Sequence, residues 1–222
     1  MTQQLDAITI SDRPVGSRQP DAAPLRSMTL GDPGSLGVLA FSTTSFMLGL
    51  YNAGLVDPRG AGLVIPVALI FGGFIQVTVA VLEVFRGNVF AAAVFGSFGP
   101  FWISYGLIES IFAAQVTEKG GAAALTSGLT VFLSMFTVLA VVFLIASLRT
   151  DMVLVAVLGL LVVALVLLIL GVHFGDTGLE HVSGYLTLAF AALGWYHGAA
   201  DVIGFTFGRS VLPTGSLARA SG

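Results

Sequence analysis

The chain has 222 residues, of which 56% are hydrophobic and 9% are charged, with a formal net charge of −3 and no cysteine. A soluble domain of this size could not bury so much apolar surface, so the composition excludes a soluble globular protein and indicates an integral membrane protein. The lack of cysteine excludes disulfides, thiol catalysis and thiolate metal sites.

The first thirty residues differ from the rest of the chain. Residues 1–30 are rich in polar residues and proline and carry three arginines, Arg13, Arg18 and Arg26. A segment of this composition cannot bury a core, and it lacks the continuous apolar stretch and cleavage site of a secretory signal. We predict that residues 1–30 form a disordered, retained cytoplasmic tail. Docking of a partner protein is an alternative role for it.

Six long apolar segments follow the tail. A bilayer core of about 30 Å needs about 20 apolar residues per helix, and the short links between the segments hold Gly, Pro and charged residues. Backbone polar groups in lipid must be satisfied within helices, and short links make neighbouring helices antiparallel. We predict an all-α integral membrane protein with a six-transmembrane-helix bundle at residues 31–212 and a short cytoplasmic tail at 213–222. The expected spans are about 36–56, 61–85, 88–114, 123–147, 150–172 and 181–207.

Basic residues are distributed unequally between the two sides of this bundle. The opposite side from the tail carries Arg59 and Lys119. The side of the tail carries seven of the nine basic residues, namely Arg13, Arg18, Arg26, Arg86, Arg149, Arg209 and Arg219. Because basic residues favour the cytoplasmic side, both termini are predicted to be cytoplasmic in a multi-pass protein of the plasma membrane.

The third span contains Gly96-Ser97-Phe98-Gly99-Pro100 near its middle. Proline removes a helical hydrogen bond and glycine weakens a helix, so we predict that the third helix is interrupted near Gly96–Pro100. A broken helix at membrane depth is tolerated where it faces protein or a cavity, and the N-terminus of a half-helix could offer N–H groups to an anion. A simple packing kink is the alternative.

Polar residues recur at helical spacing on the first two spans. Thr44 and Asn52 lie on one stripe of the first span, and Gln76 and Glu83 share a face of the second. Polar groups facing lipid are costly, so these stripes should face the interior of the bundle. Thr44 could instead bond back to its own helix, and Glu83 could form an ion pair with Arg86 at the helix end.

The last span carries His197 and Asp201, four residues apart and therefore on one face. A histidine beside a carboxylate could carry protons, and a purely structural pair is the alternative. No catalytic nucleophile, phosphate-binding loop or metal-ligand cluster accompanies them, so we predict neither an enzyme nor a cofactor or metal site. The expected surroundings are the lipid bilayer, with no nucleic-acid partner. The lack of Lys and Arg within the spans favours weak binding and rapid passage of a small solute.

Five short motifs occur in order along the chain: Asp-Pro-Gly-Ser-Leu-Gly at 32–37, Phe-Gly-Gly-Phe-Ile-Gln at 71–76, Leu-Glu at 82–83 with Arg-Gly-Asn-Val-Phe at 86–90, Ser-Phe-Gly-Pro-Phe-Trp at 97–102 and Phe-Gly-Arg-Ser-Val-Leu-Pro at 207–213. Together they resemble motifs of the acetate uptake transporter family, the succinate–acetate permeases. The family signature Asn-Pro-Ala-Pro-Leu-Gly is matched at Asp32, Pro33, Leu36 and Gly37. Aspartate replaces its asparagine, and Gly34-Ser35 replace its Ala-Pro.

The resemblance implies a transporter of acetate, succinate and related short carboxylates, built as a hexamer in which each protomer has its own pathway. Uptake would be coupled to protons, and channel-like conduction is the variant mechanism. The implied hydrophobic constriction consists of Phe41, Phe98 in place of a tyrosine, and Leu161. The alternatives are a passive channel for small anions or neutral solutes and a non-transporting membrane sensor or assembly protein. The remaining candidate site residues are Thr44, Asn52, Gln76, Glu83 and Ser97 as polar lining, with His197 and Asp201 as candidate proton-linked groups.

Overall fold

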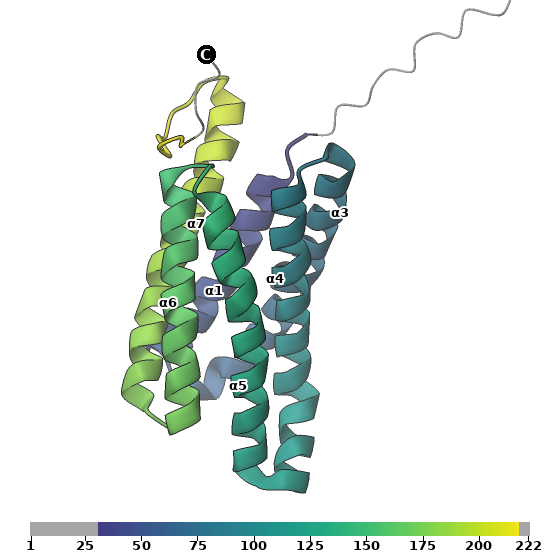
Figure 1. The fold of residues 1–222 in the computed structure, drawn as a ribbon, viewed down its shortest axis with the longest axis vertical. Coiled ribbons are helices and arrows are strands. Elements are labelled where there is room, and N and C mark those ends of the chain that lie inside the picture. The colour runs from purple at the N-terminus through teal and green to yellow at the C-terminus, as the bar shows by residue number, and fades with distance from the viewer. Residues whose placement is uncertain (1–30, 218–222) are drawn as a thin grey trace, which may run out of the picture. The chain divides into compact units, whose positions relative to one another are not determined.

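The computed structural model describes residues 31–217, which are helical over most of their length, and the predicted tail at residues 1–30 lies outside the described residues. The described chain begins with helix α1 (Gly34–Asn52) and continues through a short 3-10 helix, η1 (Pro58–Leu63) (Figure 1). The remaining helices are α2 (Val64–Val67), the π-helix η2 (Ala68–Ile75), α3 (Gln76–Arg86), α4 (Val89–Leu107), the π-helix η3 (Ile108–Phe112), α5 (Ala113–Ser147), α6 (Met152–Phe174) and α7 (Thr177–Phe207).

Four continuous helical stretches of the described chain are long and apolar enough to cross a membrane: 34–52, 58–86, 89–147 and 152–174. The third stretch has 59 residues and would be about 90 Å long if straight. Gly121, with φ 74° and ψ 179°, breaks it into two limbs. Helix α7, which carries charged residues at both ends, is not among the four stretches. The helix limits lie close to those of the predicted spans.

The predicted interruption of the third helix is wrong, because α4 runs from Val89 to Leu107 with Pro100 inside it. Pro100 lacks an N–H, so the loss is confined to the bond that would reach the carbonyl of Gly96. Neighbouring helices support such a position, and prolines are tolerated within membrane helices for this reason. The helical pattern departs from α-geometry elsewhere, at the π-helices η2 and η3.

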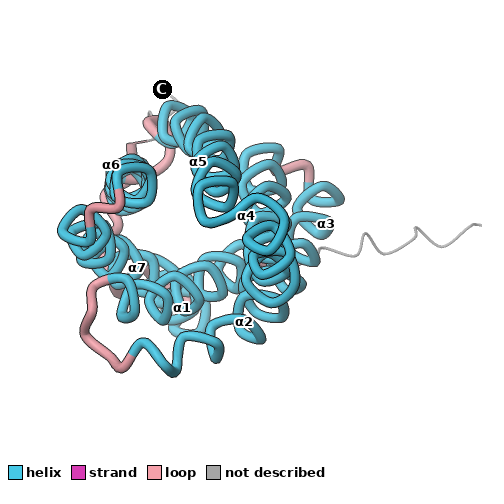
Figure 2. The backbone as a smooth tube through the Cα atoms, turned by 90° about the horizontal axis from the view of Figure 1, so that it is seen from below, coloured by secondary structure: helices cyan, strands magenta, loops and turns pink. Residues whose placement is uncertain are grey.

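Helices α1, α4, α5, α6 and α7 surround a common centre when the described bundle is viewed end-on (Figure 2). The segment from α2 to α3 packs outside this ring against α1 and α4. The central core is rich in aromatic and branched aliphatic side chains from all five helices of the ring. Its largest members include Phe41, Phe98, Trp102, Phe143, Leu161 and Phe190.

One end of the bundle is tied together by contacts between distant segments. Nη1 of Arg86, at the end of α3, lies 2.9 Å from Oδ1 of Asp32, which comes just before α1. The N–H groups of Met152 and Val153, in the first turn of α6, donate to the carbonyls of residues 215 and 214. First-turn N–H groups have no partner within their own helix, so the segment 214–217 completes the start of α6. The first part of the predicted 213–222 tail is therefore held against the bundle.

Helices α1 and α7 approach so closely that a side chain at Gly184 would overlap the backbone of Ala53. We expect Gly184→Ala to destabilise the protein by about 1–3 kcal/mol, the usual cost of overpacking, and to lower its unfolding temperature in detergent. Gly128→Ala is the matched control, because nothing lies within 4 Å of the Cβ position there. Equal unfolding temperatures for the two variants would contradict this packing of α1 on α7.

Candidate functional site

Two cavities lie in the interior of the bundle and share one pair of aromatic side chains. Cavity 1 has a volume of about 310 Å³, and its wall includes Asp32 and Asp201. Cavity 2 has a volume of about 50 Å³. Phe41 and Phe98 line both cavities. These two rings therefore stand at the boundary between the cavities.

The aromatic pair is held in place by rings from other helices. Phe41 of α1 and Phe98 of α4 have ring centroids 5.3 Å apart. Phe41 also stacks on Phe190 of α7 at 5.7 Å, and Phe98 meets the edge of Phe143 of α5 at 5.9 Å. Aromatic contacts at these separations are favourable. The boundary is thus built jointly by α1, α4, α5 and α7.

Cavity 2 is small, and the residues of 31–217 that line it are uncharged. Leu161 of α6 lies in this wall together with Phe41 and Phe98. A volume of about 50 Å³ accommodates only a few water-sized groups. The polar members of the wall are Ser45, Asn52, Trp102, Ser183 and Thr187. The hydroxyls of Ser183 and Thr187 are already engaged, since they donate to the carbonyls of Ala164 and Ser183.

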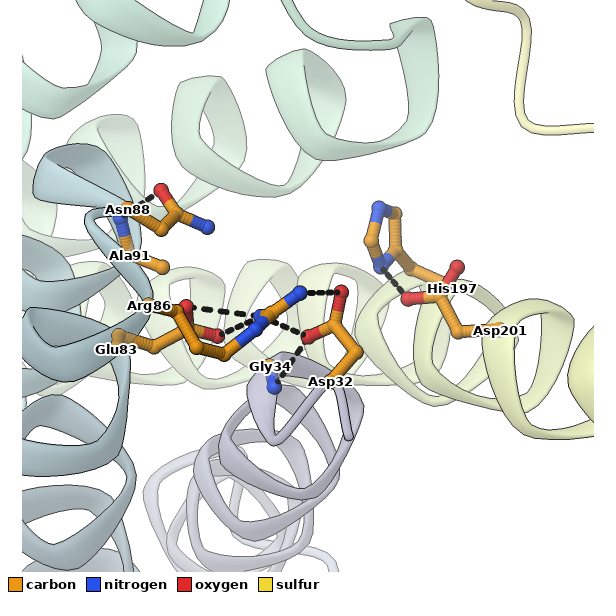
Figure 3. Close-up of polar contacts among 8 residues, drawn as sticks. All are labelled: Asp32, Gly34, Glu83, Arg86, Asn88, Ala91, His197 and Asp201. Atoms are coloured by element: carbon orange, nitrogen blue, oxygen red, sulfur yellow. Dashed lines mark hydrogen bonds and ion pairs between the residues drawn. The ribbon is translucent and has the colours of Figure 1, made fainter. Parts of the chain in front are cut away.

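An ion-pair network borders cavity 1, with Glu83 and Asp32 in the cavity wall and Arg86 between them (Figure 3). Glu83 is fully buried, and its two oxygens accept hydrogen bonds of 3.0 and 2.9 Å from Nη1 of Arg86. Arg86 also donates to both oxygens of Asp32, at 2.9 and 3.2 Å. The ion pair considered for Glu83 is present. Sequence reasoning missed its third member, because Asp32 lies 54 residues away in the chain.

His197 of α7 lies between two carboxylates. Its Nε2 is 3.0 Å from Oδ2 of Asp151, just before α6, and its Nδ1 is 3.6 Å from Asp201 on its own helix; Figure 3 shows His197 with Asp201. Asp151 also accepts from the N–H of Leu154 at 2.9 Å. Burial raises the pKa of Asp151, but the hydrogen bonds from His197 and Leu154 outweigh burial and hold the pKa below its ordinary value. Within residues 31–217, no group of three or more His, Asp or Glu side chains is placed to hold a metal ion.

The variant Asp151→Ala removes both the cap on α6 and the contact with His197, and we expect it to destabilise the protein by about 1–2 kcal/mol at neutral pH. Because folding lowers the pKa of Asp151, this contribution is present above the ordinary carboxyl range and is lost as the pH falls through the lowered value. The unfolding temperatures of wild type and variant should therefore stay apart through the ordinary carboxyl range and converge only as the pH falls through the lowered pKa of Asp151. Asp176→Ala removes only a cap on α7 and should destabilise the protein less than Asp151→Ala does. A larger loss of stability for Asp176→Ala would show that the contact of Asp151 with His197 does not stabilise the protein.

The predicted polar residues occupy different positions relative to the cavities. Gln76 is fully buried in the wall of cavity 1, and Asn52 lines cavity 2. Thr44 is buried but lines neither cavity. Its hydroxyl donates to the carbonyl of Ala40 at 2.9 Å, so it bonds back to its own helix, as the alternative interpretation of its sequence position held. Ser97 is half-buried and lines neither cavity. Neighbouring residues on a helix point in different directions, so the wall position of Phe98 turns Ser97 away.

The signature residues are mostly structural neighbours of cavity 1 rather than parts of its wall. Asp32 lines the cavity, Pro33 directly precedes α1, and Leu36 is exposed. Gly37 packs against α4, where an added Cβ would lie 2.6 Å from the ring of Phe95. The glycine therefore allows α1 to approach α4 beside the cavity.

Three buried polar atoms of residues in the cavity walls have no hydrogen-bond partner among the described residues. They are Oε1 of Gln76 and Nδ1 of His197, at cavity 1, and Nε1 of Trp102, at cavity 2. The side chains of Gln76 and Trp102 both contact Gly72: its carbonyl accepts from Nε2 of Gln76 at 2.6 Å, and its Cβ position would lie 2.7 Å from Cγ of Trp102. Sequence reasoning missed Trp102. The available signal was its position four residues after Phe98, on the same helix face.

Comparison with known proteins places this architecture in a family. The GPR1/FUN34/yaaH family matches residues 15–216. The chain belongs to this family. An uncharacterized protein of Methanothermobacter thermautotrophicus is 32% identical over 186 residues, covering 82% of this chain and 90% of its own length. The succinate-acetate/proton symporter SatP of Escherichia coli K12 is 29% identical over 186 residues, covering 84% of this chain and 96% of its own.

A solved structure of a bacterial relative has the same fold. The structure of the bacterial acetate channel SatP superposes with a TM-score of 0.73 at 29% identity, covering 84% of this chain and 99% of that one. Acetate permease A of Emericella nidulans is 28% identical over 184 residues, covering 77% of this chain and 61% of its own length. The predicted resemblance to acetate transporters is confirmed. The chain is a multi-pass membrane protein of a transporter family and not an enzyme.

Proposed function

We propose that this protein carries acetate and related short-chain carboxylates across the plasma membrane, with uptake coupled to protons. The observation that carries the proposal is the pair of cavities that share the rings of Phe41 and Phe98. The larger cavity 1, the aromatic boundary and the small cavity 2 suit a solute with a short apolar end and a compact polar end. The names of the symporter, permease and channel relatives support the same substrate class.

The walls of the two cavities form one continuous track along the helices. Wall residues recur along each helix at spacings of three, four or seven, so each helix turns one face toward the track. The track includes Val38, Phe41, Ser45, Leu48 and Asn52 on α1; Ala91, Val94, Phe98 and Trp102 on α4; Leu154, Leu158, Leu161 and Leu165 on α6; and Asp201, His197, Phe190, Thr187 and Ser183 on α7. We assign the constriction of this track to Phe41, Phe98 and Leu161.

We further propose six membrane crossings within a transport domain at residues 31–212, with the tail at 1–30 and the C-terminal residues 213–222 in the cytoplasm. The excess of arginine at one side supports this orientation, and it places cavity 1 on the cytoplasmic side. A hexamer of protomers, each with its own pathway, follows from the family resemblance. Single cysteines introduced at residues 57 and 149 should react with impermeant thiol reagents from opposite sides of the membrane.

Liposomes that contain the purified protein and a pH-sensitive dye test the transport proposal. An inward acetate gradient should acidify the lumen faster than in protein-free liposomes, whose signal measures acetic acid crossing the lipid. Competition by propionate, succinate and formate against labelled acetate would then rank the substrates. Acidification no faster than the protein-free rate would contradict acetate transport.

A passive channel for small anions or neutral solutes is the second candidate function. The similarity to a solved acetate channel favours it, as does the lining of both cavities, to which the described part of the chain contributes neither Lys nor Arg. Weak binding allows rapid passage. Planar-bilayer recordings separate the symporter from an anion channel, because an anion channel gives unitary currents under an acetate gradient without proton movement. A channel for neutral solutes gives no current and is recognised by uptake of uncharged solutes without acidification.

A further inference from the structure

We propose that the species passing the Phe41–Phe98 pair is the undissociated carboxylic acid rather than the carboxylate. Its O–H is recognised by Gln76 and its C=O by Trp102. The inference rests on the proposed transport function and specifies the chemical form in which that substrate crosses the boundary between the cavities.

Gln76 supplies a hydrogen-bond acceptor at cavity 1. Its Nε2 donates to the carbonyl of Gly72 at 2.6 Å. A carbonyl oxygen can only accept, so the NH₂ group of the amide must face Gly72 and the other atom must be the acceptor Oε1. Gln76 is fully buried, and its Oε1 meets no donor within residues 31–217. A ligand O–H would satisfy this atom, whereas a carboxylate, which only accepts, would be repelled by it.

Trp102 supplies a donor on the other side of the aromatic pair. An indole N–H cannot accept a hydrogen bond, and this one is buried in the wall of cavity 2 without a partner in the described chain. Gly72 brings the two side chains close together, since it touches both. Of the unpartnered wall atoms, these two lie beside Gly72. The acceptor of Gln76 and the donor of Trp102 are complementary to the O–H and the C=O of R–COOH.

The charges around the two cavities also oppose an anion. Residues 31–217 contribute no ionisable side chain to the wall of cavity 2, so a carboxylate there would lose its hydration without compensation. The described residues supply four carboxyl groups and one histidine to the wall of cavity 1, and Arg86 beside it is shared by two of those carboxylates. The resulting negative potential repels anions and raises the local proton concentration. The ionisable wall residues are Asp32, Glu83, Asp151, His197 and Asp201.

Passage of the neutral acid couples one proton to each carboxylate and needs no proton relay in the protein. A carboxylate takes up a proton from water on one side, crosses as R–COOH and releases the proton to water on the other side. Each turnover therefore moves a carboxylate and a proton together and transfers no net charge. Acetate uptake should consequently produce acidification without electrical current.

Neutral and strongly acidic analogues test the chemical form with the wild-type protein. Acetamide has the shape of acetic acid, offers a donor and an acceptor and carries no charge, so proteoliposomes should take it up faster than protein-free liposomes. Trifluoroacetate, which is almost wholly ionised, should not be carried. At fixed total acetate, the protein-dependent uptake should fall about tenfold per pH unit above the acid's pKa, in step with the undissociated fraction.

Two variants test the assigned groups. Gln76→Met removes the acceptor at similar volume, and Trp102→Phe removes the donor while keeping an aromatic ring. Each should slow acetate and acetamide uptake about 2- to 10-fold, the effect of one lost hydrogen bond. Thr78→Val is the matched control, because Thr78 also bonds the carbonyl four residues back on the second helical stretch but is exposed and lines neither cavity. Its uptake should equal that of the wild type.

The outcomes separate this inference from the transport proposal. The inference would be overturned, with transport left standing, by two results together. Protein-dependent acetate uptake would be independent of pH, and the protein would carry trifluoroacetate but not acetamide. Wild-type rates in Gln76→Met and Trp102→Phe would overturn the assignment of those groups. The absence of any protein-dependent uptake would overturn transport itself. If a variant does not fold, the analogue and pH measurements on the wild type still decide the chemical form.

Discussion

Replacement of Phe98 by tryptophan should slow acetate passage about 10- to 100-fold, because overpacking at this position costs about 1–3 kcal/mol. Phe98 is 2% exposed and is surrounded by other rings, so the larger indole has no free space except the boundary between the cavities. The solute must displace that ring to pass. The effect is expected on the rate of acidification of proteoliposomes loaded with a pH-sensitive dye.

The same exchange at an exposed position provides the control for Phe98→Trp. Phe205 on α7 is 90% exposed, and Phe205→Trp should transport acetate at the wild-type rate. Both variants should elute from size-exclusion chromatography as the wild type does. If Phe98→Trp is folded and carries acetate as fast as Phe205→Trp, the aromatic pair does not lie on the transport path.

The second large effect is expected at Arg86. Arg86→Met leaves the fully buried Glu83 without its cationic partner, and an unpaired buried charge typically costs about 3–5 kcal/mol. Because Glu83 borders a cavity, we expect a loss at the lower end, about 3 kcal/mol, measured as a lower unfolding temperature in detergent. The double variant Glu83→Gln with Arg86→Met should recover most of the loss, since the two residues act as one pair.

An exposed ion pair serves as the comparison for Arg86. Arg59 contacts Asp57 on the surface, where solvent screens the interaction, so Arg59→Met should leave the unfolding temperature unchanged. Equal unfolding temperatures for Arg86→Met and Arg59→Met would show that Arg86 does not stabilise the buried carboxylate of Glu83. The ion-pair network would then contribute nothing to the stability of the wall of cavity 1.

Much of the helical architecture could be predicted because bilayer thickness sets the length of apolar segments, and Gly, Pro and charged residues mark their ends. The local helix geometry could not be predicted in the same way. Pro100 stays within a regular α4, whereas the π-helix η2 contains no proline. Neighbouring helices support Pro100, and a single span contains no information about its neighbours.

The candidate site was predictable where residues share a helix face and was not where they belong to different helices. Spacing placed His197 beside Asp201, but the closer carboxylate is that of Asp151, which precedes another helix, α6. Arg86 was expected beside Glu83, but its bond to Asp32 spans 54 residues. The closeness of Phe41 and Phe98 was suggested by family resemblance, since periodicity indicates that a side chain points inward and not what it meets.

A reversible plug in cavity 1 tests most directly whether the solute moves through the two cavities. The chain has no cysteine, so Leu158→Cys provides a single thiol in the wall of cavity 1, at a position that is 3% exposed. Met135→Cys, at a position on α5 that is 58% exposed, is the control. After complete labelling with a benzyl methanethiosulfonate, verified by intact mass, acetate uptake by Leu158→Cys should fall to the protein-free rate and return on reduction, while Met135→Cys keeps its rate. Undiminished uptake by fully labelled Leu158→Cys would contradict a path through these cavities.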